Sequence, residues 1–526
     1  MKKFLTLFMM AICVFSIFIL STQSSTLDAL HFALDDPMLS YMYDFLDRML
    51  LKYPVYPFCQ DIRPYTYGQV RHLLLFFLEQ KLSILEKEQT KLYLNFLIDP
   101  KSFTSYETEE SIFKLGLHTG LHFTSRTETN EKIKREFAWQ IRPIVTGKIN
   151  KNITFSTDLR FFLIGGDNLP NTIRTEVEVD QRNEKSFDTG ALVLSYLQFE
   201  FPWFDLLIGK QNISWGPGRS DNLLLSAYGM PMEMIYFRGI YEKVSFQFFH
   251  GIGQDRTGNK IISGHRIELL PSPRYRLGLS EVVVINSRYF DPRFLNPITV
   301  YTVSEISGEG YFQYQGGDNY SKGNLLISGD ISIKLTSQID VYIELLVDDF
   351  QPRYRWESYL HWGSKWGVLL GSRVSEPFSI PNIYILLEYI FVNQYSYTHV
   401  EPLNSYFHLE KPIGFQMGPD SQSVYAKASY QLTPNLSTSL TLEIKDKGEQ
   451  KITEPRKETD KEDEHWEYLS GVEEKKAVIG LLIRFFSIGS WNFETRYNWK
   501  NIRNYGHQKN KNYVIKEFQA IGLYRF

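Results

Sequence analysis

Few side chains in this sequence stand at spacings that catalysis or metal binding requires. His118 and His122 are four residues apart, so on an extended strand they share one face and could hold a metal ion together. No carboxylate or third imidazole accompanies them, and polar lining is the simpler interpretation. The chain has no G-x-S-x-G, H-E-x-x-H or GxxxxGK[ST] motif. We predict a protein that is not an enzyme and uses no metal or cofactor. A hydrolase is a third-ranked alternative, which would need a nucleophile, a base and an acid at one place.

Two segments contain unusual combinations of residues. Residues 208–226 read IGKQNISWGPGRSDNLLLS, and the Gly-Pro-Gly of this segment must break a strand, because proline lacks an N–H and glycine permits unusual dihedral angles. Trp215 therefore stands at a strand end, with Arg219 just beyond it. Residues 395–430 form a second loop, rich in proline and glycine, that contains Tyr406, His408, Lys411 and Asp420.

The last strand of the chain has one apolar face. In YVIKEFQAIGLYRF one parity carries Val514, Phe518, Ala520, Tyr524 and Phe526, and the other carries Glu517, Gln519 and Arg525. An amphipathic final strand that ends in an aromatic residue resembles the C-terminal strand of a Gram-negative outer-membrane β-barrel.

The N-terminus predicts export. Lys2 and Lys3 precede an apolar run from Phe4 to Leu20, and small polar residues follow. This order is that of a signal peptide, which we place at residues 1–25. A retained membrane anchor is the alternative.

The composition fits a barrel wall better than a helical membrane protein. The chain has 33 Tyr, 38 Phe and 9 Trp, yet its mean hydropathy is -0.26, and beyond the signal no apolar run is long enough for a membrane-spanning helix. A barrel strand needs only about ten residues with every second one apolar. The net charge of -3 argues against a nucleic-acid partner, and Cys59 is the only cysteine after the signal, so no intramolecular disulfide is possible.

Residues 26–110 are predicted to be a helical element. Apolar residues recur there at steps of three and four, and two capping boxes mark helix starts, namely Thr66 with Gln69 and Ser83 with Glu86. About 65 helical residues are few for an independent domain. We therefore expect the element to pack against the periplasmic end of the barrel, with an autonomous periplasmic bundle as the alternative.

From residue 111 to residue 526 the apolar period is two. We count about 18 strand candidates, including a less regular one near Val300, and predict an all-β, transmembrane, antiparallel barrel of about 18 strands. The stretch from Lys447 to Glu474 is charged and reads as a loop outside the membrane. The residues expected to face lipid include Leu115, Leu117, Ile331, Ile333, Val341 and Ile343.

Several segments together resemble the Wzi-type capsule-assembly outer-membrane proteins. The resemblance rests on WGPG followed by LLLS and Pro231, FLNPITVY at 294–301, LLISGDISIKL, DVYIELLVDDF and HLEKPIGFQMGPDS. It extends from Arg63-Pro64-Tyr65 to the end of the chain.

The resemblance implies a monomeric barrel in the outer membrane, in contact with its lipid, that attaches capsular polysaccharide to the cell surface as a lectin. Trp215 and Arg219 fall on the shared motif and become the candidate polysaccharide-binding residues, because an aromatic face beside a cation suits sugar rings and acidic sugars. Trp215 could instead belong to the interfacial aromatic girdle. A general porin or transport channel is the alternative function, since a lumen with mixed charge, such as Arg160, Asp330, Lys334 and Glu344, fits both.

Overall fold

The computed structural model describes residues 27–31, 37–98, 104–108, 110–129, 131–150, 152–167, 178–180, 188–255, 258–286, 292–301, 323–348, 365–399, 401–454, 468–487 and 491–526. The predicted signal peptide, residues 1–25, lies outside these ranges, as does most of the charged stretch after Glu454.

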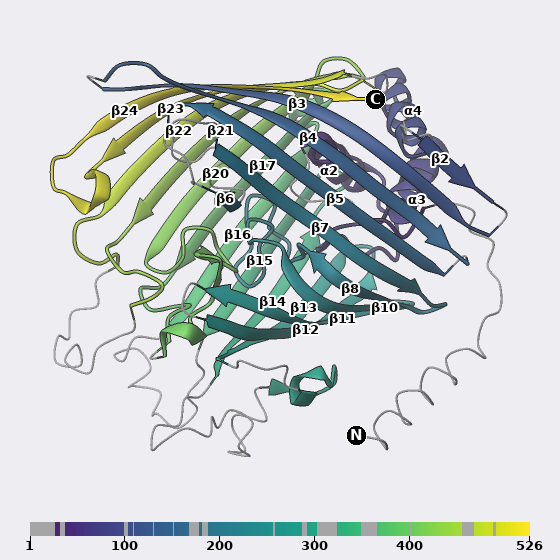
Figure 1. Ribbon diagram of the computed structural model, residues 1–526, viewed down its shortest axis with the longest axis horizontal. Coiled ribbons are helices and arrows are strands. Elements are labelled where there is room, and N and C mark those ends of the chain that lie inside the picture. Colours follow the sequence, from purple (N-terminus) through teal and green to yellow (C-terminus); the bar gives the residue numbers. More distant parts are fainter. Residues whose placement is uncertain are drawn as a thin grey trace.

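A closed antiparallel barrel of 18 strands makes up most of the described chain (Figure 1). Its strands are β3 (Ile112–Glu128), β4 (Lys134–Ile149), β5 (Ile153–Gly166), β7 (Asp188–Glu200), β8 (Phe204–Gln211), β10 (Met232–Tyr241), β11 (Val244–Asp255), β12 (Gly258–Ser272), β13 (Tyr275–Ile285), β14 (Asn324–Lys334), β15 (Ile339–Asp348), β16 (Lys365–Ser375), β17 (Ile383–Val392), β20 (Ser421–Gln431), β21 (Leu436–Lys447), β22 (Glu474–Phe485), β23 (Trp491–Arg503) and β24 (Tyr513–Arg525). Strand β24 pairs with β3 and closes the barrel. The predicted fold class is confirmed.

Short elements complete the described structure. They are β1 (Ile62–Arg63), β2 (Thr104–Glu107), β6 (Glu178–Asp180), β9 (Ser214–Trp215), β18 (Phe407–His408), β19 (Lys411–Pro412), and the 3-10 turns η1 (Pro292–Leu295), η2 (Pro377–Ser379), η3 (Pro402–Asn404) and η5 (Tyr505–His507). The strand expected near Val300 is wrong, because this residue follows η1 in a segment whose Phe294 and Tyr301 pack against Val283 and Leu325.

The face of each strand follows the period of two. Ile331 and Leu345 are 43% and 48% exposed, whereas their neighbours Asp330 and Glu344 are 3% and 1% exposed. In the last strand Phe518 is 40% exposed and Glu517 only 2%. The residues predicted to face lipid all lie on this outward parity, because apolar side chains must cover a wall that has hydrocarbon outside it.

The two ends of the barrel differ. At one end the connections are short, for example residues 201–203, 242–243, 273–274 and 335–338, and the chain also ends there. At the other end long segments connect the strands, among them 212–231 and 393–420. Outer-membrane barrels have short periplasmic turns and longer extracellular loops.

Three helices, α2 (Pro37–Lys52), α3 (Tyr67–Leu78) and α4 (Ile84–Ile98), pack at the end with the short connections (Figure 1). Both predicted capping boxes are present, at Thr66 with Gln69 and at Ser83 with Glu86. The helices pack on one another through Leu46, Leu73 and Phe77, all buried. No helix among the described residues is long and apolar enough to cross a membrane.

Contacts between the helices and the barrel lie near the short turns. Lys52 bonds to Glu376 (2.8 Å), in the turn between β16 and β17. Lys427 of β20 bonds to Asp44 (2.6 Å). The ring of Phe486, which follows β22, lies 5.5 Å from that of Tyr93. The helical element therefore covers this end of the barrel.

Candidate functional site

Residues 212–231, which join β8 to β10, fold into the barrel and meet the N-terminal element there. Strand β9 of this inward segment pairs with β1, so that Ile62 lies opposite Trp215. The glycines of the Gly-Pro-Gly sequence are required by the geometry. Gly216 has a φ of +124°, and a Cβ on Gly218 would lie 1.8 Å from the carbonyl oxygen of Asp221.

Trp215 lies inside the barrel and not in its outer aromatic girdle. Its side chain is 1% exposed, and its ring meets that of Phe249 edge to face, with centroids 5.4 Å apart. Ile213, Leu223 and Leu225 of the same segment belong to the same buried cluster. In this arrangement the indole stabilises the position of the inward segment and has no open face for a sugar ring.

Arg219 is likewise buried, with 4% of its side chain exposed. Its guanidinium lies 3.2 Å from Asp47 of α2 and 3.1 Å from Asp61. It also donates to the carbonyl oxygens of Pro217 (2.9 Å) and Gln60 (3.2 Å). Its donors are thus directed at the N-terminal element and at its own loop.

Asp61 is the centre of a charge network that joins three parts of the chain. Its carboxylate accepts from Arg276 of β13 (2.8 Å) and from Arg219 of the inward segment (3.1 Å). Arg276 also donates to Asp340 of β15 (2.8 Å), which in addition pairs with Arg373 of β16.

The two aspartates of the N-terminal element are held ionised. Burial alone would raise the pKa of Asp61, but the charges of Arg276 and Arg219 outweigh it and lower that pKa below its ordinary value. Burial also opposes ionisation of Asp47, whose pKa is lowered by Arg219 and Arg63. The network therefore stabilises the docked position of the helical element at neutral pH.

One side of the lumen is filled by an apolar core. Wall residues of β10 to β17 pack there against the inward segment and against residues 393–420, which include Tyr397 and Tyr406. The hydroxyls of these tyrosines donate to the carbonyl oxygens of Leu223 (2.5 Å) and Leu224 (2.7 Å). Glu344 accepts from the backbone N–H of the same two residues at 3.0 and 3.2 Å. This carboxylate holds the inward segment and does not line an aqueous channel.

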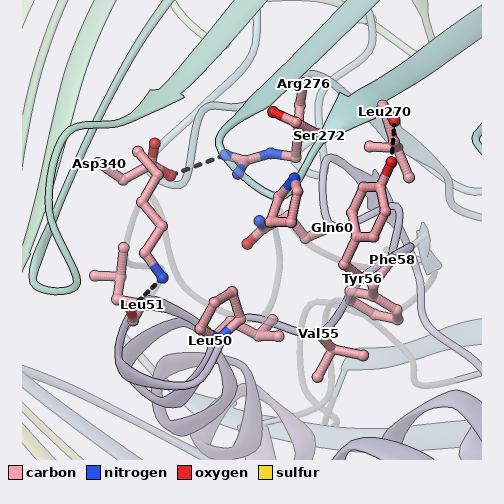
Figure 2. A pocket seen from close by; sticks show the side chains of 13 residues that line it. Leu50, Leu51, Val55, Tyr56, Phe58, Gln60, Leu270, Ser272, Arg276 and Asp340 are labelled. Carbon is pink, nitrogen blue, oxygen red and sulfur yellow. Dashed lines mark hydrogen bonds and ion pairs between the residues drawn. The ribbon is translucent and has the colours of Figure 1, made fainter.

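A small cavity remains between α2 and the barrel wall (Figure 2). Leu50, Val55 and Tyr56 lie on one side, and Leu270 and Arg276 on the other. The Tyr56 hydroxyl closes one edge by donating to the carbonyl oxygen of Leu270 (2.8 Å). The volume of ≈ 20 Å³ suffices for a water molecule but not for a sugar ring.

The opposite side of the lumen keeps accessible polar groups. Tyr228, near the end of the inward segment, is 56% exposed. The charges that act on its hydroxyl include those of Asp221, of Glu443 in β21 and of Arg496 in β23, and the side chain of Arg496 is 42% exposed. Both strand residues lie on the inward parity of their strands. An exposed aromatic ring in the same part of the lumen as an acid and a guanidinium offers a stacking face together with hydrogen-bond donors and acceptors. We call Tyr228, Glu443 and Arg496 the lumen site.

The inward segment contains the two predicted site residues, Trp215 and Arg219, as well as Tyr228. Trp215 packs against Phe249 and Arg219 pairs with Asp47 and Asp61. That either residue binds polysaccharide stays a prediction. Tyr228, 13 positions after Trp215, was missed because nothing local distinguishes it from the chain's other tyrosines. His118 and His122 both face inward, and His122 lies 3.0 Å from the side-chain oxygen of Gln140. No group of three or more possible metal ligands occurs among the described residues.

Comparison with known proteins identifies one family and several similar structures. The family model of the capsule assembly protein Wzi matches residues 117–513. Wzi of Escherichia coli, an outer-membrane protein of group 1 capsule assembly described as a carbohydrate-binding β-barrel, has a similar structure with a TM-score of 0.58 at 14% identity, over 94% of this chain and 99% of that one.

Two further structures are less similar. OprD of Pseudomonas aeruginosa has a TM-score of 0.42 at 10% identity, over 81% of this chain and 99% of that one. OccAB2 of Acinetobacter baumannii has a TM-score of 0.45 at 9% identity, over 78% and 98%. A search of curated protein sequences gave no match.

Proposed function

Because the chain belongs to the capsule assembly protein Wzi family, we propose that it binds exported polysaccharide at the cell surface and thereby attaches it to the outer membrane. The chain is an outer-membrane β-barrel of a non-enzymatic family, as the sequence predicted. Its relative in E. coli is described as carbohydrate-binding, and the proposal extends that property to this chain.

The lumen site is the observation that carries the proposal. A ring that is 56% exposed shares the lumen with the inward-facing Glu443 and with Arg496, whose side chain is 42% exposed. Sugars present both C–H faces, which pack on aromatic rings, and hydroxyls, which bond to charged groups. A polysaccharide segment would approach these groups from the end with the long loops, where residues 212–231 leave and rejoin the wall.

The helical element is proposed to lie on the periplasmic side, because it packs at the end with the short connections. There it would close the barrel toward the periplasm, which fits an attachment protein and not a general porin. The protein is proposed to act as a monomer.

Deletion of the protein tests the function. We expect polymer synthesis to continue and the polymer to be released into the medium, because attachment shifts a binding equilibrium and forms no bond. Purified barrel in a planar bilayer should conduct small ions poorly. Capsule that stays attached in the deletion strain, together with a freely conducting barrel, would favour the porin alternative.

A pair of tyrosine variants tests the site. Tyr228→Ala should weaken binding of the purified capsular polysaccharide about fivefold, since an aromatic contact contributes about 1 kcal/mol. Tyr241→Ala is the matched control, because Tyr241 is 72% exposed but stands at the short turn after β10. If both variants retain wild-type binding while deletion still releases the polymer, the function holds and the lumen site is wrong.

A further inference from the structure

Four cations gather on the outward face of the barrel near the end with the long loops. We call Arg135 (β4), Lys475 (β22), Arg503 (β23) and Lys516 (β24) the cationic belt. All four are exposed, and each shares the parity of lipid-facing neighbours, as Lys516 does with Phe518. With β3 between β24 and β4, these strands are consecutive around the barrel.

The belt stands at the rim of the membrane-facing wall. Lys475 is the second residue of β22, Arg503 the last of β23, Lys516 the fourth of β24 and Arg135 the second of β4. Aromatic side chains follow toward the middle of the wall. Tyr497 pairs with Phe518 and Phe123 with Phe137 across neighbouring strands. At a membrane–water interface, cationic side chains lie on the water side of a row of aromatic side chains, and the belt has this arrangement.

The charges of the belt are poorly neutralised by the described protein. Lys475 and Arg503 lie directly opposite each other in the β22–β23 register, an arrangement that is destabilising for like charges. Lys475 bonds to Glu473 (2.7 Å). Among the described residues, the side chains of Arg135, Arg503 and Lys516 have no ion-pair partner. Asp446 of β21 also lies opposite Lys475, so Arg135, Arg503 and Lys516 are the belt residues most available to an external anion.

Another part of the wall shows the contrast. Lys210 of β8 also faces outward near the end with the long loops, but it lies directly opposite Glu233 of β10. Lys210 thus has an acid of this chain directly across from it, as Lys475 has in Asp446, whereas the strand partners of Arg135 and Lys516 are uncharged.

We propose that the cationic belt binds the phosphate groups of a phosphorylated glycolipid in the outer leaflet, with the aromatic row against its acyl chains. The belt faces the membrane and not the lumen, so its anion must come from the lipid phase. Lysine and arginine near a membrane surface attract anionic headgroups, and arginine binds phosphate through two parallel hydrogen bonds. The inference requires only that the barrel lies in the outer membrane, and not that it binds polysaccharide.

Binding of purified lipid A to the full-length barrel in an uncharged detergent tests the proposal. The diphosphorylated form should bind, and the fully dephosphorylated form should bind at least 10-fold more weakly. Each of Arg135→Gln, Arg503→Gln and Lys516→Gln should weaken binding about fivefold, because a cation near a membrane surface strengthens binding of an anionic headgroup by about that factor. The triple variant should bind about 100-fold more weakly, since three such factors multiply. Lys210→Gln, the matched control, should leave binding unchanged.

Three results would overturn the proposal. They are wild-type binding by the triple variant, equal binding of both lipid forms, and an equal loss in Lys210→Gln. Folding is checked by heat-modifiable gel mobility, and these exposed side chains are not needed for the barrel core. If the triple variant instead loses only its binding of capsular polysaccharide, the belt serves that polymer and the glycolipid assignment is wrong.

Discussion

Replacing Asp61 by asparagine should loosen the helical element without opening the barrel wall. The substitution keeps the shape of the side chain and removes its charge. Asp61 is 1% exposed, and its carboxylate accepts from Arg276 at 2.8 Å and from Arg219 at 3.1 Å. Asparagine offers one acceptor oxygen and turns an N–H₂ toward the second guanidinium.

The size of the effect depends on the ion-pair partners that Arg276 and Arg219 retain after the substitution. Removing one partner of a buried ion pair costs about 3 to 5 kcal/mol. Arg276 retains Asp340 at 2.8 Å, and Arg219 retains Asp47 at 3.2 Å. We therefore expect the lower end, about 3 kcal/mol, which is roughly a 100-fold larger population with the element undocked.

Cys59 reports this population directly. Its side chain is 6% exposed within the core that the element shares with the inward segment, and burial raises the pKa of its thiol above the ordinary value. A thiol reagent therefore reacts with Cys59 only after undocking. The labelling rate of purified Asp61→Asn should exceed that of the wild type about 100-fold.

Asp158→Asn is the matched control. Asp158 is also buried and bonds to two arginines, Arg142 (2.7 Å) and Arg160 (2.8 Å), but all three belong to β4 and β5. It should leave the labelling rate of Cys59 unchanged. An equal rate in Asp61→Asn and wild type, or an equal rise in both variants, would refute the idea that Asp61 holds the element in place.

Three further outcomes are expected. Ile343→Arg should destabilise the barrel by about 2 to 4 kcal/mol in urea unfolding if this outward residue is near mid-membrane, and a neutral result would show the parity to be misassigned. In intact cells an impermeant thiol reagent should label Lys451→Cys but not Ile84→Cys, which are 71% and 86% exposed at opposite ends; labelling of the latter would contradict a periplasmic element. The pKa values of Asp47 and Asp61 are lowered in the folded state. Their contribution to docking is therefore complete at any pH above the pKa of an unfolded aspartate, about 3.9, and it is lost as the pH falls through their pKa values in the folded protein. Hydrogen exchange of the helices should thus rise only below about pH 4, and exposure of the helices between pH 5 and 7 would argue against this network.

Local features of the sequence were sufficient for the barrel wall and for the helix starts. The period of two sets which side chain faces lipid, as at Ile331 and Asp330, because adjacent residues of a strand point to opposite faces. The capping boxes at Thr66 and Ser83 are similarly local, since each joins residues three positions apart. The strand expected at Val300 failed because an apolar run can also pack outside the wall as an irregular segment.

The contents of the lumen depended on tertiary structure. Glu344 has the alternation of a lumen residue, yet it accepts from the backbone of residues 223 and 224, more than a hundred positions away. Period alone cannot tell a water-lined face from one that binds a folded loop, because both require polar side chains at alternate positions.

At the candidate site, too, some features follow from the local sequence and others only from the tertiary structure. The sequence alone determined that the Gly-Pro-Gly after Trp215 ends a strand, because proline and glycine act through the local backbone. Only the tertiary structure decided that Trp215 and Arg219 turn inward while Tyr228 stays open. Arg219 meets Asp61 across 158 positions, and such a pairing is selected by the closure of the barrel around the helical element, which brings together charges that no local pattern links.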